Sequence, residues 1–348
     1  MNPKDRTRCA VIGASGYAGE ELVRLLIAHP RADLAAVTSR QNVGRTLGEA
    51  FPRFDQVNET SQLRFSDSDA AKISDAADLV FLALPHGVSA SAAQGFLDHG
   101  ARIIDLSADF RLRDRVIYKE YYGAEHPAPE LLSRGVYGLP EFYRAKIVGA
   151  DLVACPGCYP TSILLPLLPL LQARLISPER ITVASLSGVS GAGRKVEADY
   201  LFAECNESAR PYGVPKHRHL SEIEQELKNL AGATASIQFV PHLVPMNRGI
   251  VSTIFVDLAN APDEQAIEAA YQTAYDGAAF VRLLGTKRLP DTKNVVGTNF
   301  IDISWKTDPR TGRLVVMSAI DNLIKGTSGQ AIQCLNLMFG YPEPMGLL

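Results

Sequence analysis

The 348-residue sequence lacks the features that mark membrane, secreted and nucleic-acid-binding proteins. Its most apolar run, residues 163–171, is too short to cross a bilayer and contains two prolines, so it predicts a buried helix instead. The N-terminus passes from polar residues straight into a strand-like segment, without an apolar signal region. The formal net charge of −3 gives no basic field for nucleic acid. We therefore expect a cytoplasmic protein that binds neither a membrane nor a nucleic acid.

Cysteine is scarce, and its number is odd. Five cysteines in a chain without a signal region favour reduced thiols over a disulfide framework. Two of them, Cys155 and Cys158, form a C-P-G-C motif, which could be a redox dithiol, half of a metal site, or a lone nucleophile with a bystander. A closed zinc site needs four ligands, and the sequence has neither a second C-x-x-C nor paired spacing among the other cysteines. We therefore expect no metal.

The first half of the chain alternates short apolar runs with helical patterns, as βαβ units do. A helix is expected at residues 18–30, where Pro30 stops it. Strands are expected at 8–14, 33–39, 77–85, 101–109 and 151–157. Because these runs are apolar almost throughout, they suit a parallel sheet that is covered on both faces.

Beyond residue 160 the pattern changes to longer strands joined by short turns. Strands are expected at 236–246, 248–259, 299–307 and 313–321, the first two almost touching and the last two joined by DPRTG. Adjacent strands with tight turns predict a mixed or antiparallel sheet in a second, α+β domain. The tail after residue 322 is typical of a Gly/Ser turn followed by a helix. We expect the domain boundary near residue 155.

A glycine triplet, Gly13, Gly16 and Gly19, lies between the first strand and the first helix. This G-x-x-G-x-x-G spacing allows a tight turn, close approach of a pyrophosphate to backbone N–H groups, and a helix N-terminus with partial positive charge. The loop therefore predicts a dinucleotide site. The residues that complete it are Ser15, Tyr17 and Ala18.

The end of the second strand indicates which dinucleotide is bound. NAD sites usually place a carboxylate there to hold the ribose 2′-OH. This strand ends with Thr38, Ser39 and Arg40 and has no acidic residue. A hydroxyl beside a guanidinium suits a 2′-phosphate, so NADP is favoured, and a solvated loop arginine is the alternative.

Position separates the two cysteines of the C-P-G-C motif. The segment after Cys158 is typical of a helix start, with Pro160 in the first turn. Cys158 would lie just before the helix N-terminus, where the partial positive charge stabilises a thiolate. Cys155 ends an apolar strand and is expected to be buried and inert. In a thioredoxin-type motif the first cysteine attacks, so we interpret Cys158 as a lone nucleophile.

A nucleophilic thiol needs a base, and the sequence offers seven histidines. Ser221 and Glu224 match an S-x-x-E capping box, which predicts a helix that begins near residue 222. His217 and His219 would then lie in an extended segment and point to the same side, with Glu222 close enough to orient an imidazole. A basic surface loop is the alternative.

The remaining histidines are interpreted by their context. His86 is expected at a strand end over the cofactor, and His242 is expected within a strand with its hydrogen bonds satisfied. His29, His99 and His126 lie in polar, helix-end or loop contexts and are expected to be solvated.

Several motifs in a fixed order resemble one known family. They are the glycine loop, LALPHG, DLSADFRL, PGCYPT, SGVSGAGRK, HRHLSEIEQE, PHLVPMNRGI and DNLIKGTSGQA. Together, from about residue 8 to 343, they closely resemble the N-acetyl-γ-glutamyl-phosphate reductases of arginine biosynthesis, which belong with the semialdehyde dehydrogenases. The resemblance implies an α/β Rossmann domain of residues 1–157 and 322–348. It also implies an inserted α+β domain of residues 158–321, which carries the catalytic cysteine and the contacts of a homodimer or homotetramer.

The resemblance further implies a reaction. Such enzymes reduce the small acyl phosphate N-acetyl-γ-glutamyl phosphate with NADPH to the semialdehyde and phosphate. Cys158 would attack the acyl phosphate to give a thioester, hydride transfer would follow, and the resulting hemithioacetal would collapse to aldehyde and thiol. The family pattern points to His217 or His219 for the acid/base step, and the choice between them stays open.

The implied substrate carries a phosphate and a carboxylate, so cationic residues are expected around it. Arg111 with Ser107 is the choice for the phosphate, and Arg194 and Lys195 are candidates for either anion or are surface cations. Glu222 is grouped with the substrate site. The residues expected near the cofactor's nicotinamide half are Leu84, Pro85, His86, Ser187, Gly188, Gly191 and Asn322.

Other functions stay open at this point. A sister dehydrogenase acting on aspartyl phosphate or on an N-acyl-aminoadipyl phosphate is the nearest one. A non-catalytic NADP-binding regulator would need no activated thiol. A thiol–disulfide oxidoreductase would need both Cys155 and Cys158, and an inhibitory disulfide between them is a further possibility.

Overall fold

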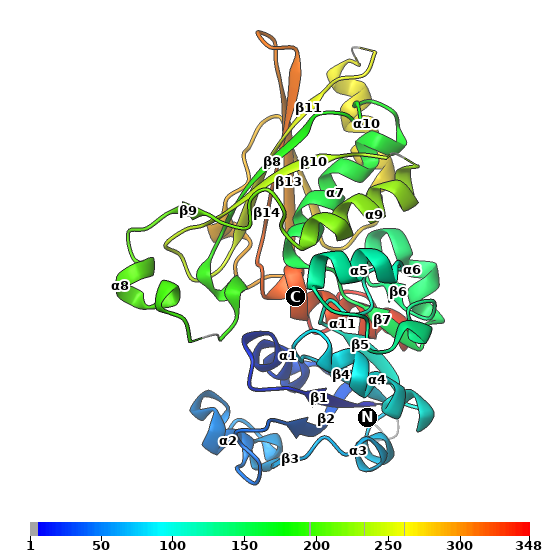
Figure 1. Ribbon diagram of the computed structural model, residues 1–348, viewed down its shortest axis with the longest axis vertical. Helices are drawn as coiled ribbons and strands as arrows, with labels where there is room; N and C mark the ends of the chain where they lie inside the picture. Colours follow the sequence, from blue (N-terminus) through cyan, green and yellow to red (C-terminus); the bar gives the residue numbers. More distant parts are fainter. Residues whose placement is uncertain (1–5, 195, 233, 261) are drawn as a thin grey trace. The chain divides into compact units, whose positions relative to one another are not determined.

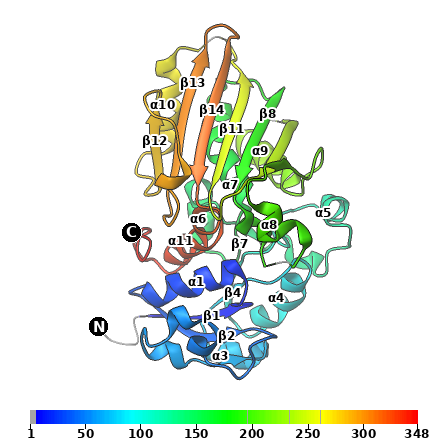
Figure 2. The same ribbon diagram turned by 90° about the vertical axis from the view of Figure 1, so that its left-hand side faces the viewer.

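A computed structural model describes residues 6–194, 196–232, 234–260 and 262–348. The chain forms two compact units, Met1–Pro156 with Thr327–Leu348, and Gly157–Gly326. Each unit is built on one seven-stranded sheet (Figures 1 and 2). Among the described residues, no helix is both long and apolar enough to cross a membrane.

The first unit is a doubly wound parallel sheet, as the apolar runs predict. Its strand order is β3-β2-β1-β4-β5-β7-β6, and every pairing in it is parallel. The strands are β1 Thr7–Ile12, β2 Ala32–Thr38, β3 Phe65–Ser66, β4 Leu79–Leu82, β5 Arg102–Asp105, β6 Val136–Tyr137 and β7 Leu152–Ala154. Its helices are α1 Tyr17–Ala28, α2 Leu47–Ala50, α3 Ala70–Ala76, α4 Val88–Asp98, α5 Arg115–Tyr122, α6 Pro140–Val148 and α11 Gly329–Met338.

The core of the first unit explains why these runs form strands. All four residues of β4 are buried, and so are the apolar residues of its neighbours β1 and β5 and of β7, which follows β5 in the sheet. A strand buried on both faces needs helices on both sides of the sheet. The C-terminal helix α11 supplies part of this cover, and it packs against α1 and α6. The expected α/β fold of this unit is confirmed.

The second unit is a mixed sheet whose three longer helices, α7, α9 and α10, lie on one face (Figure 2). The strand order is β12-β13-β14-β11-β8-β10-β9. The strands are β8 Ile181–Ser187, β9 Arg210–Pro211, β10 Ile237–Leu243, β11 Ile250–Asp257, β12 Val281–Gly285, β13 Ile301–Asp308 and β14 Arg313–Ile320. The helices are α7 Cys158–Gln172, α8 Phe202–Cys205, α9 His219–Ala231 and α10 Glu264–Ala274.

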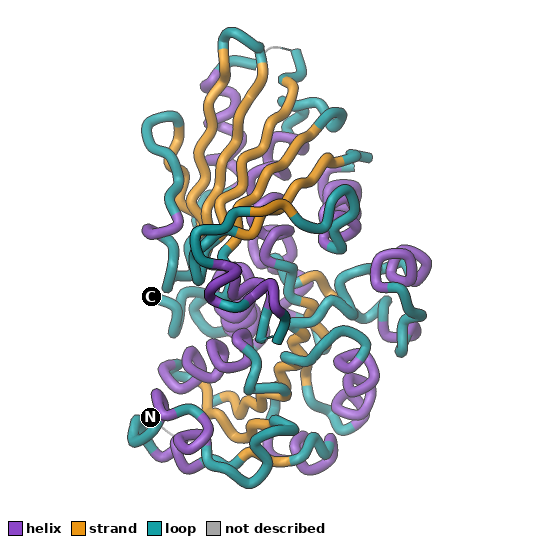
Figure 3. Tube along the Cα trace, turned by 60° about the vertical axis from the view of Figure 1, so that its left-hand side comes forward, coloured by secondary structure: helices purple, strands orange, loops and turns teal. Residues whose placement is uncertain are grey.

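The β13–β14 hairpin forms as predicted, but β10 and β11 are not neighbours. Strand β8 lies between them, parallel to β10 and antiparallel to β11. Figure 3 shows the strands of this sheet side by side in orange. The expectation of a tight turn joining these two strands is therefore wrong. The link contains Pro245 and Gly249, and Val244 N donates to Ser187 O at the end of β8, so the link crosses β8 instead of turning back on itself.

Helix α7 is almost completely buried although it contains Pro166 and Pro169. Proline lacks the N–H that would bond to the carbonyl four residues earlier. Other side chains supply these bonds: Ser318 Oγ donates to Ser162 O at 2.6 Å, and the Tyr275 hydroxyl donates to Leu165 O. The freed carbonyls are thus satisfied by the sheet and by the segment after α10. This fixes the helix that begins with Cys158.

Candidate active site

Cys158 is the first residue of α7, and it follows the extended N-cap residue Gly157. Its side chain is half-buried, whereas Cys155, just beyond the end of β7, is fully buried. The helix N-terminus places partial positive charge at the Cys158 thiol and favours its thiolate. No disulfide joins any of the five cysteines, all of which lie in the described part of the chain. The predicted helix start and the burial of Cys155 are both confirmed.

The capping box predicted for the H-x-H segment is wrong. Helix α9 begins at His219, three residues early, because Leu220 N already bonds to His217 O. Ser221 Oγ donates to Arg218 O, and Glu224 accepts from Ile237 N, so neither side chain caps this helix. The two histidines are therefore not in an extended segment.

The turn nevertheless brings the two imidazoles together. Their ring centroids lie 4.9 Å apart, and the backbone N–H of His219 donates to Nδ1 of His217 at 3.1 Å. Tyr159 and Phe239 contact the His217 ring edge-on. Burial, and then the positive charge of Arg218, lower the pKa of His217 to about 4. His217 is therefore neutral at pH 7.

His219 lies directly against the peptide that precedes Cys158. A Cβ on Gly157 would come within 2.6 Å of His219 Nε2, so only glycine fits there. On another side, a Cβ on Gly326 would come within 2.8 Å of Cys158 Cβ. The imidazole is buried, with only 8% of its surface exposed. Gly157 thus places the histidine next to the nucleophile, and Gly326 packs against Cys158 itself.

Glu222 also contacts the residue before Cys158. Its side chain is 1% exposed, and Oε1 accepts a hydrogen bond from Gly157 N at 2.8 Å. Glu222 lies one turn after His219 on α9, so one face of this helix presents both side chains.

The glycine loop of the first unit has the geometry of a phosphate cradle. Gly13 adopts φ +88°, and a Cβ on Gly19 would come within 2.5 Å of Gly13 O. Because neither residue has a side chain, the backbone can make the close turn into α1. Gly16 is the N-cap of α1, and Tyr17 and Ala18 begin the helix. A Cβ on Gly16 would come no closer than 3.9 Å to its nearest neighbour. The helix N-terminus can therefore be approached closely by a phosphate.

The polar residues at the end of β2 and just after it differ in exposure and in hydrogen bonding. Thr38 Oγ1 accepts from Gly13 N at 3.2 Å, and Ser39 Oγ donates to Ser15 Oγ at 3.0 Å, so these hydroxyls tie the strand end to the glycine loop. Arg40 is exposed beside them. A guanidinium at this point could hold a ribose 2′-phosphate.

The loop after β5 carries two of the residues assigned to the substrate. The Arg111 guanidinium is buried, donating from Nε to Cys155 O at 2.7 Å and from Nη2 to Leu106 O at 3.0 Å. Ser107 Oγ donates to Asp105 Oδ2 at 2.7 Å. Burial, and then the nearby charge of Asp109, raise the pKa of Asp105 to about 6. Arg111 therefore ties together the loops that follow β5 and β7.

The LALPHG turn is held by the same buried loop. Both Asp109 oxygens accept from Gly87 N at 2.8 Å, and Oδ2 also accepts from Ala90 N, which caps α4. Leu84 is half-buried, and Pro85 and His86 are exposed at the end of β4. The turn thus has a fixed position next to the end of β4, as expected for His86.

The two family models that match the chain together cover most of it. The semialdehyde dehydrogenase NAD binding domain matches residues 8–150, and the semialdehyde dehydrogenase dimerisation domain matches residues 158–322. A protein of Akkermansia muciniphila described as N-acetyl-gamma-glutamyl-phosphate reductase is 54% identical over 343 residues, which cover 98% of this chain and 99% of that one. One of Geotalea daltonii with the same description is 48% identical over 341 residues, covering 98% and 97%. The chain belongs to the N-acetyl-γ-glutamyl-phosphate reductase family.

Solved structures agree with this membership at the level of the fold. Aspartate semialdehyde dehydrogenase of Candida albicans, crystallised with NADP, covers 96% of this chain and 99% of its own with a TM-score of 0.72 and 16% identity. Aspartate semialdehyde dehydrogenase II of Vibrio cholerae gives a TM-score of 0.74 at 15% identity and covers 96% and 98%. At these identities the likeness shows the fold alone.

The other residues assigned to the site of this reductase family member lie in different settings. Asn322 is buried, donating from Nδ2 to Ser190 Oγ at 2.9 Å and accepting from Gly249 N at 2.7 Å. Ser187 is the last residue of β8, and Gly188, directly after it, packs against the peptide between Asn247 and Arg248. Gly191 and Arg194 are exposed, and Lys195 lies outside the described residues.

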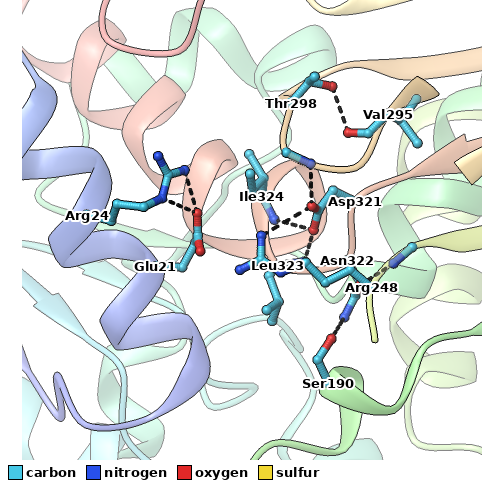
Figure 4. Close-up of polar contacts among 12 residues, drawn as sticks. Glu21, Arg24, Ser190, Arg248, Val295, Thr298, Asp321, Asn322, Leu323 and Ile324 are labelled. Carbon is cyan, nitrogen blue, oxygen red and sulfur yellow. Dashed lines mark hydrogen bonds and ion pairs between the residues drawn. The ribbon is translucent and has the colours of Figure 1, made fainter. Parts of the chain in front are cut away.

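Sequence reasoning missed one cation of the second unit, Arg248 in PHLVPMNRGI. Its Nη1 lies 3.4 Å from Oδ2 of the fully buried Asp321, which also accepts from the backbone N–H groups of Gly297, Leu323 and Ile324 (Figure 4). The carbonyl of Asp321 accepts from Gly326 N, and Gly326 touches Cys158. The motif contains this arginine, but no pattern in the sequence predicts that Asp321 holds it there.

Two histidines expected to be solvated are buried. His29 forms a 2.9 Å hydrogen bond through Nε2 with Asn336 of α11, and His126 forms one of 2.8 Å with Asp109 O. His29 is covered by the C-terminal segment, far along the chain, whereas His126 is covered by Phe110 and Tyr118 of the preceding loop and helix. The expectation was therefore wrong for His29 and His126. His99 is exposed as expected, and His242 lies within β10 as expected. Its Nδ1 is buried without a hydrogen-bond partner among the described residues, so the expectation of satisfied hydrogen bonds was wrong for His242.

Proposed function

We propose that the chain reduces N-acetyl-γ-glutamyl phosphate with NADPH to N-acetylglutamate γ-semialdehyde and phosphate, in arginine biosynthesis. The observation that carries this proposal is the 54% identity to a reductase of that name over almost the whole of both chains. The packing of Cys158 against Gly326, and of His219 against the peptide before Cys158, supports the chemistry.

The residues of the second unit have separate tasks in this reaction. The Cys158 thiolate attacks the carbonyl of the acyl phosphate, the C–O bond to phosphate breaks, and a thioester remains on sulfur. His219 takes the thiol proton before attack and returns a proton when the thiol is released. NADPH, when bound, supplies the hydride that reduces the acyl group. The N-terminus of α7 stabilises the negative charge on sulfur before the attack and again when the thiolate leaves.

His219 is the better candidate for the proton transfer. Its Nε2 lies against Gly157, next to the nucleophile. His217 has a pKa near 4, and its Nδ1 already accepts the backbone N–H of His219. A base that is neutral far below pH 7 is a weak proton acceptor at neutral pH. We therefore propose that His217 does not transfer the proton but keeps His219 in place by accepting its backbone N–H.

The glycine loop and Arg40 would hold the cofactor. Backbone N–H groups from Gly13 to Gly19 and the N-terminus of α1 suit a pyrophosphate, and Arg40 suits the 2′-phosphate that distinguishes NADPH. For the substrate, Arg111 remains our choice for the phosphate, with Arg194 and Lys195 as alternatives. We add Arg248 as a candidate for the carboxylate, because Asp321 holds it in the same unit as Cys158.

We further propose a homodimer that buries the helix-free face of the second sheet. The half-buried side chains of that face include Val251, Phe255, Val315 and Met317, and Leu186 beside them is 42% exposed. The match to a dimerisation domain supports this assignment. A homotetramer is the alternative.

The reverse reaction tests the function. NADP reduction would be followed with N-acetylglutamate semialdehyde and phosphate, on the wild type and on Cys158→Ser side by side. We expect turnover for the wild type and none above background for the variant. Turnover with aspartate semialdehyde alone would assign the chain to a sister enzyme. Unchanged turnover in Cys158→Ser would show that Cys158 is not the nucleophile.

A further inference from the structure

We propose that Glu222 is a positioning residue whose carboxylate holds the Gly157 peptide, so that Cys158 at the start of α7 stays beside His219. The inference rests on the proposed thioester chemistry for its consequence in turnover. Its geometric basis, the hydrogen bond from Gly157 N to Glu222 Oε1 at 2.8 Å, is independent of the substrate.

The peptide before the nucleophile is held at both of its polar groups. Gly157 N donates to Glu222, and Gly157 O accepts from Thr161 N at 3.0 Å and from Thr161 Oγ1 at 3.1 Å. An N-cap glycine has no side chain of its own to fix the first turn of a helix, and glycine is the most flexible residue. The orientation of Cys158 relative to this peptide therefore depends on partners outside α7, and the Glu222 carboxylate is one of them.

Helix α9 carries both Glu222, which holds the Gly157 peptide, and His219, the proposed base. His219 and Glu222 are three residues apart on α9, so both side chains reach α7 from the same helix face. Helices α7 and α9 pack closely against each other. Because His219 Nε2 lies against Gly157 while Glu222 binds the N–H of the same residue, the peptide is fixed relative to the imidazole from two sides.

The burial of Glu222 indicates that it positions the Gly157 peptide and does not bind the substrate. Only 1% of the side chain is exposed, and Oε1 is engaged by the backbone of Gly157. The sequence grouped Glu222 with the substrate site, and a substrate contact would need an accessible oxygen. A negative charge here would also oppose a thiolate on Cys158. The useful property of the side chain is therefore its acceptor oxygen, which an uncharged amide can replace.

Substitutions can separate the acceptor from the charge. Glu222→Gln keeps an oxygen of the same reach, Glu222→Ala removes it, and Glu222→Asp keeps the charge but shortens the side chain by one methylene. Glu226→Gln is the matched control, because Glu226 is a buried glutamate one turn further along the same helix and accepts from Gln225 and Asn229. Two quantities would be measured: kcat and KM for the proposed substrate, and the rate of Cys158 alkylation by iodoacetamide as a function of pH.

Positioning predicts a loss in kcat and in thiol reactivity, with little change in KM. We expect Glu222→Gln and Glu226→Gln to stay within about threefold of the wild type in both readouts, and Glu222→Ala and Glu222→Asp to lose roughly 10- to 100-fold in kcat, as small misplacements of reacting groups do. The alkylation profile of these two variants should shift in parallel. If Glu222→Ala fails to fold, Glu222→Asp and Glu222→Gln still decide the question.

Three results would overturn the proposal. A rise in KM with kcat unchanged would make Glu222 a substrate contact. A loss of tenfold or more in Glu222→Gln, with Glu222→Asp close to the wild type, would mean that the charge, not the acceptor, matters. Wild-type kcat and alkylation in folded Glu222→Ala would leave the bond with no role at the nucleophile. Alkylation needs no substrate, so it decides the positioning role even if the proposed reaction is not the one this chain performs.

Discussion

At the scale of single residues, two histidines two positions apart have very different surroundings. His217 is enclosed by aromatic rings and accepts a backbone N–H, which keeps it neutral. His219 begins α9 and places Nε2 against Gly157. The sequence predicted that the pair belongs to the site. It could not separate them, because the difference lies in tertiary contacts: Phe239 packs against His217, whereas Nε2 of His219 lies against Gly157.

This difference predicts unequal effects of substitution on turnover. His219→Asn should lower kcat roughly 10²- to 10⁴-fold, the usual contribution of a general acid/base. His217→Asn keeps an oxygen that can accept the His219 N–H, so kcat should fall by less than about tenfold. Steady-state kinetics of both variants with the proposed substrate measures this. The reverse order of effects would exchange the roles of the two histidines.

The lowered pKa of His217 also predicts a pH dependence of stability. The folded pKa is about 4 and the ordinary value is 6.5, so between these values the unfolded chain binds a proton that the folded chain does not. Stability from this group is present above pH 6.5 and is lost as the pH falls towards 4. The loss is at most about 3.5 kcal/mol, at about 1.4 kcal/mol per pH unit.

Urea unfolding across this range, on the wild type and His217→Asn, measures that contribution. The variant should lose less stability on acidification than the wild type. Asp105 titrates in the same window with the opposite sign, because its pKa is raised to about 6, and it contributes equally to both proteins. Parallel curves for the two proteins would show that His217 is not buried as neutral imidazole.

At the scale of elements, helix α7 depends on donors from outside itself. Pro169 removes the N–H that Leu165 O would accept, and the Tyr275 hydroxyl takes its place. Tyr271 donates to Pro166 O, a carbonyl that no proline deprives of its helical partner. The two tyrosines therefore differ in importance although both are buried and bond to the same helix.

A double-mutant cycle tests this replacement. Tyr275→Phe should lower the free energy of unfolding by about 1–3 kcal/mol, the cost of a buried acceptor without a partner. Tyr271→Phe should cost about 0.5–1.5 kcal/mol, since Pro166 O keeps its backbone bond. In a Pro169→Ala background, where the N–H is restored, Tyr275→Phe should cost clearly less. An equal loss of unfolding free energy for Tyr275→Phe in both backgrounds would show that the Tyr275 hydroxyl does not replace the missing N–H of Pro169.

Elements whose signal is local were predicted from the sequence, and those set by distant partners were not. The β1–glycine loop–α1 unit and the β13–β14 hairpin follow from apolar runs and turn residues. The start of α9 was misplaced because Ser221 and Glu224 match a capping pattern but bond elsewhere. The separation of β10 and β11 was missed because β8, more than 50 residues earlier, inserts between them.

At the scale of the whole molecule, family membership predicts an assembly, and the second sheet offers the surface for it. Leu186→Arg places a charge on the helix-free face of β8 and should shift a dimer towards monomer. Light scattering after size-exclusion chromatography measures the mass. Val116→Arg, at a 67% exposed position on α5 of the first unit, is the control that should leave the mass unchanged. An unchanged mass for Leu186→Arg would exclude this face as the interface.

The site as a whole was predicted as a set of motifs but not as an arrangement. Cys158, His219 and Glu222 were named from the sequence, yet the contacts that unite them pass through Gly157, which no pattern singled out. Arg248 was quoted within a motif and given no task. Its neighbour Asp321 comes from the far end of the second unit, and only folding places the two together.

The central claim, that Cys158 carries the acyl group, is tested most directly by trapping. The protein would be mixed with N-acetyl-γ-glutamyl phosphate without NADPH, quenched in acid and mapped by mass spectrometry. We predict an N-acetylglutamyl adduct on Cys158 that hydroxylamine releases, with phosphate formed in equal amount. An unmodified Cys158, or an adduct mapped to Cys155 or to any other residue, would contradict the account.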